Sequence, residues 1–391
     1  MKRVAWIASS MVILFGVGLF VLHLKWENNS ITVRNIYILD KTVFNSKYLE
    51  HKSFFWVLSN LHYQKPDGNP YRYDKDYFGF YPIDPELGTF DFRTIRLVEI
   101  DRMADSLDMV YYIDCYGVYS EDWMGSKNSA LGQKVYGGLN QNDYLLLKGM
   151  KERGKLIVAE HNLFSHLGGG LEKEKLSELF GFTWTGWIGR SFPSFDTTKS
   201  NRPPAWVVNI YTTTQHKTWP NSEGGIVFVG DRDRVVLLIN GHELEDSKVS
   251  IVSPPSTVKH FGVEPKVSFT KWFEVIEAGP SLSTFSNFML HLTPEGSSLL
   301  RNNGIPESFP AALGCSSGYQ LYYFAGDFSH TPVYMATSEM VGGDLLNSAI
   351  SSTLRPLGFE FFNGYYRPFL SKILSSYKAP NSAVDSLPPT N

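Results

Sequence analysis

The first strong hydrophobic pattern is an uninterrupted apolar run from Val4 to Leu24 that contains no formal charge. A run of about 20 apolar residues can cross the hydrocarbon core of a bilayer as a helix. Lys2 and Arg3 precede the run. The positive-inside rule then predicts a cytoplasmic N-terminus and a body on the far side of the membrane. A cleaved signal peptide is the alternative, but no A-x-A cleavage pattern follows the run, and this favours an uncleaved, single-pass anchor.

The next patterns alternate between strand and helix periods. Ile31–Leu39 alternates and is rich in β-branched residues, which predicts a strand. Tyr48–Leu61 places apolar residues at helical spacing. Residues 64–92 are rich in Pro, Gly, Asp and aromatic residues and predict a long irregular loop.

The clearest pattern follows. Asp108–Ile113 and Lys155–Ala159 are short apolar runs typical of buried strands. Asn140–Arg153 and Leu171–Phe180 have the spacing of helices, and a glycine directly follows each of them. Strands that alternate with helices through short links predict a parallel sheet covered by helices.

From Trp184 onward the pattern is less regular and richer in strands. Trp184–Arg190 and the Pro203-Pro204 pair are loop-like. The other predicted elements are a hairpin of residues 225–229 and 234–239, strands at 268–277, 287–292 and 319–325, and a helix at 345–357.

These elements predict three parts of the chain. Residues 1–29 form a cytoplasmic stub and membrane anchor, and residues 30–377 form an extracytoplasmic α/β body that can be subdivided near residue 183. Residues 378–391 are rich in Pro, Ser and Asn, which predicts a disordered tail.

Composition narrows the class of protein. Hydrophobic residues make up 43% of the 391 residues, enough for a sizeable core. The net charge of -3 excludes a typical nucleic-acid binder, which needs a basic excess to neutralise phosphates. Cys115 and Cys315 allow one disulfide, but two buried thiols are the favoured interpretation.

Three segments carry a resemblance to a known superfamily: Asp108–Ile113, Gly138–Tyr144 and Lys151–Val158. Their order resembles the core of the class I glutamine-amidotransferase-like superfamily. It is most similar to branches without amidotransferase activity, such as trehalose-utilisation-type proteins and the β-galactosidase trimerisation domain. Gly318–Asp327 is similar to the strand that closes the sheet there. The resemblance covers less than half of the chain and implies a flavodoxin-like, mostly parallel sheet with an elaborated, more β-rich second half.

The catalytic members of that superfamily carry a cysteine in a G-x-C-x-G turn after the strand that matches Lys155–Ala159. This chain has Glu160-His161-Asn162-Leu163 at that turn. A nucleophile elbow needs a small residue for its strained turn, so the resemblance implies a domain without amidotransferase activity. Cys115 follows the preceding strand, which is the wrong position for the elbow.

Polar residues follow three of the predicted strands. Asp114 ends one strand, Glu160 and His161 end the next, and Asp327 with His330 follows the late strand. Ligands of open α/β sheets bind beyond the carboxyl ends of the strands, so we expect these residues at one cleft. Paired carboxylates and a histidine can perform acid–base catalysis, which makes Glu160, His161, Asp114 and Asp327 the candidate catalytic residues. The alternative is that they cap helices or pair with arginines.

Neither a metal nor a cofactor is predicted, because the chain has no H-x-H, H-E-x-x-H or C-x-x-C spacing. We interpret three further histidines as ordinary helix or loop residues: His51, His62 and His166.

Aromatic residues make up 15% of the chain, and many lie in segments that look like loops. Flat rings there can present an apolar face to a ligand such as a glycan, although filling core is the simpler interpretation. Trp187, Arg190 and His330 are the candidate ligand-binding residues. For Arg190, pairing with an acid is the favoured interpretation, and binding of an anionic group is the alternative. The loop-like tryptophans are Trp123, Trp184, Trp187, Trp206, Trp219 and Trp272.

Three functions fit these features. The first is a non-catalytic, membrane-anchored protein that binds a glycan or scaffolds envelope proteins in polysaccharide assembly. The second is an extracytoplasmic hydrolase that uses the four candidate catalytic residues. The third is a purely structural anchor. Whether the chain is an enzyme stays open at this point.

Overall fold

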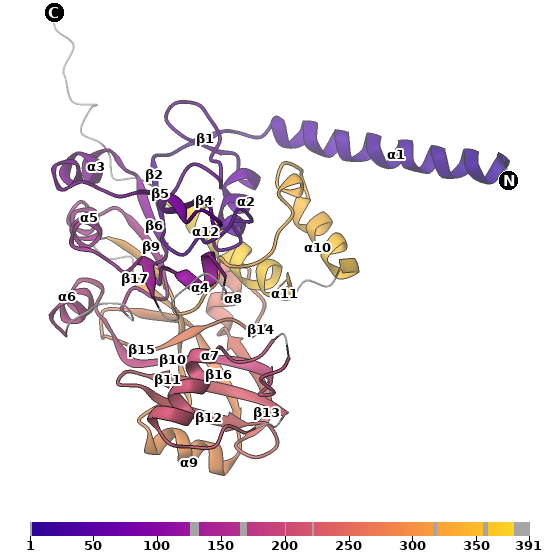
Figure 1. Ribbon diagram of the computed structural model, residues 1–391. Helices are drawn as coiled ribbons and strands as arrows, with labels where there is room; N and C mark the ends of the chain where they lie inside the picture. Colours follow the sequence, from indigo (N-terminus) through magenta and orange to yellow (C-terminus); the bar gives the residue numbers. More distant parts are fainter. Residues whose placement is uncertain are drawn as a thin grey trace, which may run out of the picture.

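The computed structural model describes residues 2–125, 133–164, 170–199, 201–220, 223–315, 319–354 and 359–378. A long N-terminal helix projects from a body built on one large sheet (Figure 1). The predictions for His166 and for residues 379–391 lie outside the described residues. Both cysteines are free thiols; Cys115 is buried, as expected, whereas Cys315 is only partly buried.

The large sheet has ten strands in the order β14-β13-β16-β17-β18-β9-β6-β2-β4-β5. Its parallel half comprises β18 (Gln320–Phe324), β9 (Leu156–Glu160), β6 (Met109–Asp114), β2 (Ile36–Asp40) and β4 (Phe78–Asp84). The antiparallel strands are β14 (Lys266–Phe269), β13 (Leu244–Val252), β16 (Ser283–Leu292), β17 (Ser308–Cys315) and β5 (Thr89–Arg93). The sheet is therefore mixed, and the prediction of a mostly parallel sheet is correct only for one half.

Helices cover both faces of the parallel half (Figure 1). On one side lie α3 (Ile100–Ser106), α5 (Gln141–Glu152) and α6 (Gly170–Phe180). On the other side lie α2 (Lys52–Asn60) and α12 (Arg367–Ser376). Because both faces are covered, every residue of β6 and β9 is buried, which explains their continuous apolar sequences.

A second sheet packs below the first in Figure 1. Its order is β12-β11-β10-β15, formed by Arg234–Ile239, Glu223–Gly230, Phe182–Ser194 and Phe273–Ala278. One hydrophobic core runs continuously from the ten-stranded sheet into this sheet, through buried residues such as Ile226 and Val275. The predicted hairpin of β11 and β12 is confirmed.

Several local predictions are wrong. The segment Trp184–Arg190 is not a loop but the middle of the 13-residue strand β10, whose partners are distant in sequence. The predicted strand 268–277 divides into β14 and β15, which belong to different sheets. The supposed loop 64–92 contains β4 and most of β5. In the first two cases pairing with remote strands outweighs the weak local preference, whereas β4 and β5 pair mainly with each other.

Elements that were not predicted include β13, β17, α3, α12, α8 (Pro255–Phe261) and α9 (Pro294–Asn302). The late helix is α10, which is described as Gly343–Leu354.

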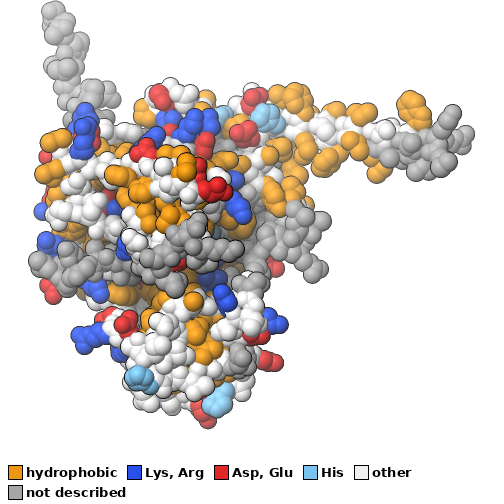
Figure 2. All heavy atoms as spheres, viewed as in Figure 1, with side chains coloured by type: hydrophobic (Ala, Val, Ile, Leu, Met, Phe, Trp, Pro, Cys, Tyr) orange, Lys and Arg blue, Asp and Glu red, His pale blue; other side chains and the backbone are white. Residues whose placement is uncertain are grey.

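The N-terminal helix α1 (Lys2–Glu27) contains a stretch, Ser9–Glu27, that is long and apolar enough to cross a membrane. The body buries none of that stretch, and its hydrophobic side chains project freely (Figure 2). Only its last turns touch the body. There the Trp26 indole stacks on His62 at 4.5 Å and donates hydrogen bonds to the carbonyls of Ser59 and Asn60.

Gly79 allows β4 to pack closely against β2. Its φ of +136° is a conformation that side chains rarely adopt, and a Cβ there would lie 1.6 Å from the carbonyl oxygen of Asp40. The turn glycine Gly88 also has positive φ, but a Cβ there would meet only the Met124 sulfur, at 3.7 Å.

This difference predicts unequal costs for two identical substitutions. Gly79→Ala should reduce the free energy of unfolding by roughly 3 kcal/mol or more, because it adds a backbone clash to conformational strain. Gly88→Ala should cost about 1–2 kcal/mol, from strain alone. Urea denaturation of both variants in detergent measures the difference, and equal costs would contradict the close approach of β2 and β4.

Candidate functional site

Carboxylates gather at one edge of the ten-stranded sheet. Asp40, Asp114 and Glu160 are the last residues of β2, β6 and β9, and Asp327 follows the end of β18. Because these four strands are parallel, their carboxyl ends meet at the same edge. The structure thus brings the sequence-predicted residues to one place.

Glu160 is completely buried and fully hydrogen-bonded. One carboxylate oxygen accepts the hydroxyl of Tyr111. The other accepts the backbone N–H of Phe328 at 2.9 Å, and the backbone N–H and hydroxyl of Ser329 at 3.0 and 3.1 Å. Burial raises the pKa of Glu160 to about 8, although these hydrogen bonds oppose the rise. Glu160 therefore holds the turn that follows β18 against the end of β9.

Asp114 is held in a similar way. One of its oxygens accepts the backbone N–H of Tyr116 at 2.6 Å and the side-chain amide of Asn162 at 3.1 Å. Burial, followed by the charges of Asp40 and Asp327, raises the pKa of Asp114 well above its ordinary value. Asp40 in turn binds Nδ1 of His51 at 2.7 Å. These acids are tied into the protein.

The two sheets meet at this edge. The backbone N–H of Glu274 donates to the carbonyl of Ala325 at 2.8 Å, and the N–H of Asp327 donates to the carbonyl of Trp272 at 3.0 Å. This short antiparallel contact places the residues before β15 beside the residues after β18. It brings Lys271 and Trp272 to the carboxyl edge, and β10 follows because Gly189 pairs with Phe273.

Asp327 is the centre of the resulting cluster. One of its oxygens lies 3.2 Å from Nδ1 of His330. Burial alone would raise the pKa of Asp327, but the nearby His330, His161 and Lys271 together hold it below its ordinary value. Asp327 is therefore an ionised carboxylate surrounded by nitrogen-bearing side chains.

Two cations of this cluster have no close partner. Burial lowers the pKa of both Arg190 and Lys271, and Asp327 is the nearby acid that opposes this shift in each. Within the described part of the chain, neither forms an ion pair, and the buried Nε of Arg190 has no hydrogen-bond partner. The Arg190 guanidinium lies over the rings of Phe192 and Trp272, at 5.0 and 5.9 Å from their centres. Arg190 is therefore not paired with an acid, contrary to the simpler alternative.

His161 is also buried, and one of its ring nitrogens is left without a partner by the described residues. Burial lowers the pKa of His161 to about 4, so its ring is neutral near pH 7. Its Nδ1 has no hydrogen-bond partner among the described residues. A buried polar atom without a partner is costly, and at a cleft it often marks the place of a ligand.

Glu160, His161 and Asp327 together offer one ligand atom each within 4.8 Å of one another, a separation that a metal ion can bridge. Two features oppose a cation there. Both oxygens of Glu160 already accept hydrogen bonds, and Asp327 lies near the charges of Lys271 and Arg190. The donor set fits a metal, but the surrounding charge favours an anion.

The prediction that Trp187 binds a ligand is wrong. Its side chain is only 2% exposed and belongs to the core, so it is not placed to contact a ligand at the edge. The structure adds Lys271, for which no local sequence signal exists, and it places Trp272, one of the loop-like tryptophans of the sequence, beside it. It also adds Asp40, which the rule of polar residues at strand ends would have identified.

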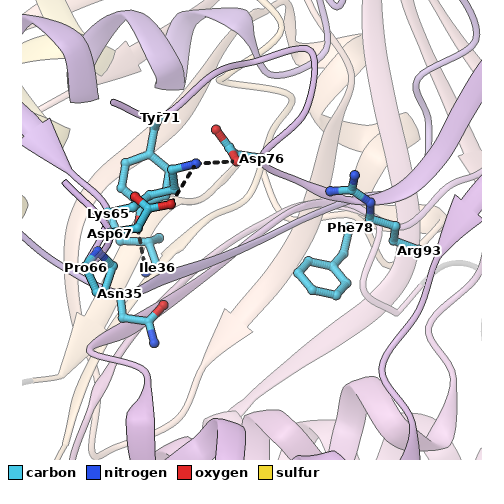
Figure 3. A pocket seen from close by; sticks show the side chains of 9 residues that line it. All are labelled: Asn35, Ile36, Lys65, Pro66, Asp67, Tyr71, Asp76, Phe78 and Arg93. Carbon is cyan, nitrogen blue, oxygen red and sulfur yellow. Dashed lines mark hydrogen bonds and ion pairs between the residues drawn. The ribbon is translucent and has the colours of Figure 1, made fainter. Parts of the chain in front are cut away.

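The described part of the molecule also contains a pocket of about 330 Å³ at the opposite, amino-terminal edge of β2 (Figure 3). Lys65 there lies between Asp67 and Asp76, at 3.8 and 3.0 Å. Its polar groups satisfy one another, and we do not treat it as the functional site. Its lining residues are Asn35, Ile36, Lys65, Pro66, Asp67, Tyr71, Asp76, Phe78 and Arg93.

The chain matches no protein-family model and no curated protein sequence. The solved structures that it matches include two described as ThuA-like proteins. One, from Bacteroides uniformis ATCC 8492, is 7% identical with a TM-score of 0.37, over 77% of this chain and 84% of that one. The other, from Parabacteroides merdae ATCC 43184, is 8% identical with a TM-score of 0.34, over 81% and 91%. A cytoplasmic protein from Salmonella typhimurium LT2 is 10% identical with a TM-score of 0.36, over 88% and 98%.

The raised pKa of Glu160 predicts a pH dependence of stability. The folded protein keeps this proton up to about pH 8, whereas the unfolded chain releases it near pH 4.5. The contribution of Glu160 to the free energy of unfolding is thus fully present below the unfolded pKa. It is lost as pH rises from the unfolded to the folded pKa, by about 1.4 kcal/mol per pH unit.

Glu160→Gln removes the titration, so its stability should fall less steeply than that of the wild type between pH 5 and 8. Urea denaturation at each pH measures both slopes. Parallel slopes would show that Glu160 is ionised in the folded state.

Proposed function

We propose that this chain is a membrane-anchored, extracytoplasmic protein that binds an acidic glycan, without catalysis, at the carboxyl edge of its ten-stranded sheet. The observation that carries the proposal is the pair of uncompensated cations, Arg190 and Lys271, beside Asp327. The binding role would serve the assembly of a polysaccharide or of the cell envelope.

The argument for an anion is energetic. Removing a cation from water costs several kcal/mol unless an opposite charge compensates it. Here Arg190 and Lys271 share the neighbourhood of one ionised acid, which also binds His330. Glu50 is nearby, but burial raises its pKa to about 7 and weakens its negative charge. One further negative charge would balance the cluster, and a ligand carboxylate would supply it.

The argument for a sugar comes from the adjacent rings. Trp272 lies under the Arg190 guanidinium and stacks on Trp206, with ring centres 6.1 Å apart. Trp206 is 40% exposed, so the stack reaches the surface. Sugar rings pack their C–H faces on such indoles, while the indole N–H offers a hydrogen bond. A uronic acid combines the sugar face with the carboxylate.

The hydrolase alternative is weaker. A general acid must reach its substrate, but Glu160 uses both oxygens to accept four hydrogen bonds inside the protein. Asp114 is likewise bound by Tyr116 and Asn162. Glu160 and Asp114 are therefore structural acceptors, and this supports a binding protein over an enzyme.

The membrane part of the proposal predicts a topology. Protease added outside intact cells or spheroplasts should digest the body, because Lys2 and Arg3 favour retention of the N-terminus in the cytoplasm. Immunoblotting with a C-terminal tag detects the digestion. A body that is protected until the membrane is permeabilised would place it in the cytoplasm.

The binding part predicts a selective loss of affinity. Arg190→Gln and Lys271→Met should each weaken binding of a uronic-acid trisaccharide by roughly 10- to 100-fold, since a charged hydrogen bond contributes about 1.5–3 kcal/mol. Calorimetry in detergent, at low and high salt, measures this loss.

Arg234→Gln is the matched control, because this cation also lies over a tryptophan, Trp187, but already pairs with Asp231 at 3.0 Å. It should leave binding unchanged. A neutral trisaccharide bound as tightly as the acidic one, or equal losses in all three variants, would contradict an anion site.

A further inference from the structure

The body makes a second contact with α1 beyond the Trp26 stack. The backbone N–H of Val341 donates to the carbonyl of Leu22 at 3.2 Å, and His23 Nδ1 lies 2.8 Å from the carbonyl of Glu339. Both anchor residues lie within the apolar stretch Ser9–Glu27. The segment before α10 is therefore fixed to the side of the candidate membrane helix, and not below its end.

The depth of this contact follows from helix geometry. Leu24 is the last residue of the apolar run, and Leu22 precedes it by two residues, or about 3 Å of helical rise. Val341 thus lies at the level where the hydrocarbon core gives way to the headgroups. Figure 1 shows α10 next to the end of α1 that joins the body.

The segment carries apolar side chains that the body does not cover. Leu345 is 72% exposed, and Val341, four residues earlier, is 39% exposed. Val341 lies in the turn that precedes α10, and Leu345 lies in the first turn of that helix, so two uncovered apolar side chains occur within five residues of each other. In water this exposure is unfavourable, at roughly 25 cal/mol for each Å² of apolar surface.

The charges of this region fit a membrane surface. Asp344 is the only charged residue of α10, and it pairs with Arg367 at 3.0 Å. Arg367 is at the start of α12, so this ion pair directs the Asp344 carboxylate toward the body. Glu339 is exposed and lies beside His23, close to Lys25, at the level where a carboxylate meets headgroups and water.

We propose that Val341, in the turn before α10, and Leu345, in the first turn of α10, insert into the lipid leaflet that α1 leaves, and so form a second, interfacial membrane contact. Apolar side chains of a segment that lies in the plane of the interface commonly reach about 5–10 Å into the boundary between headgroups and acyl chains. The contact holds the body at a fixed orientation against the bilayer. This inference rests on the proposed membrane anchoring by α1.

The test uses the full chain in phosphatidylcholine liposomes. Leu345→Cys, in a Cys315→Ser background that leaves only the buried Cys115, is labelled with the fluorophore NBD. We expect blue-shifted emission and strong quenching by lipids that carry a spin label near the headgroup. Val98→Cys is the matched control, since Val98 is 86% exposed and lies in the loop that leads into α3. Its label should be neither shifted nor quenched.

Flotation separates the two claims. If the chain does not float with the liposomes, the anchoring proposed for α1 fails, and this inference falls with it. If the chain floats but the label at residue 345 resembles the one at residue 98, the lipid contact alone is wrong. The blue shift could instead depend on the protein-to-lipid ratio while spin-labelled lipid fails to quench the label. That result would show that a second copy of the chain covers these side chains, and it would also overturn the inference.

Discussion

The architecture of the candidate site depends on one buried carboxylate. Glu160 ends the central strand β9, and its side chain accepts the backbone N–H groups of Phe328 and Ser329, which begin the turn after β18. These are donors that no strand pairing satisfies, and leaving them buried and unpaired would cost about 1–3 kcal/mol each. By binding them, Glu160 fixes the turn that presents Asp327 and His330.

The same turn joins the two sheets. Asp327 and Ala325 form backbone hydrogen bonds with Trp272 and Glu274, so the four-stranded sheet begins where the parallel strands end. Lys271 and Arg190 reach the carboxyl edge through this junction and not through any neighbour in sequence. The edge consequently combines the acids of the first sheet with the cations and rings of the second. An anion site can arise from this combination, since the acids are already satisfied within the protein and the cations are not.

The abundance of aromatic residues has mainly a structural cause. Most of the largest fully buried side chains are Tyr, Phe or Trp, including Trp56, Tyr111 and Tyr323, which fill the space between the sheets and helices. Buried tyrosines also supply hydroxyl donors to the buried acids, as Tyr111 does for Glu160 and Tyr323 for Glu274. The Trp206–Trp272 stack combines exposure with cations that lack an ion pair among the described residues. That combination separates a ligand-facing ring from the many rings of the core.

The sequence by itself determined the apolar helix, the strands β6 and β9, the capped helix α5 between them, and the carboxylates at the strand ends. These features depend on local periodicity, on capping by Asn140, and on the rule that parallel strands end at one edge. Only the tertiary structure decided that Trp184–Arg190 is a strand, that Trp187 is buried, and that Lys271 and Arg190 stand beside Asp327. Each of these depends on pairing between segments many residues apart. Such pairing is set by packing of the two sheets, and no local pattern around residue 190 or 271 records it.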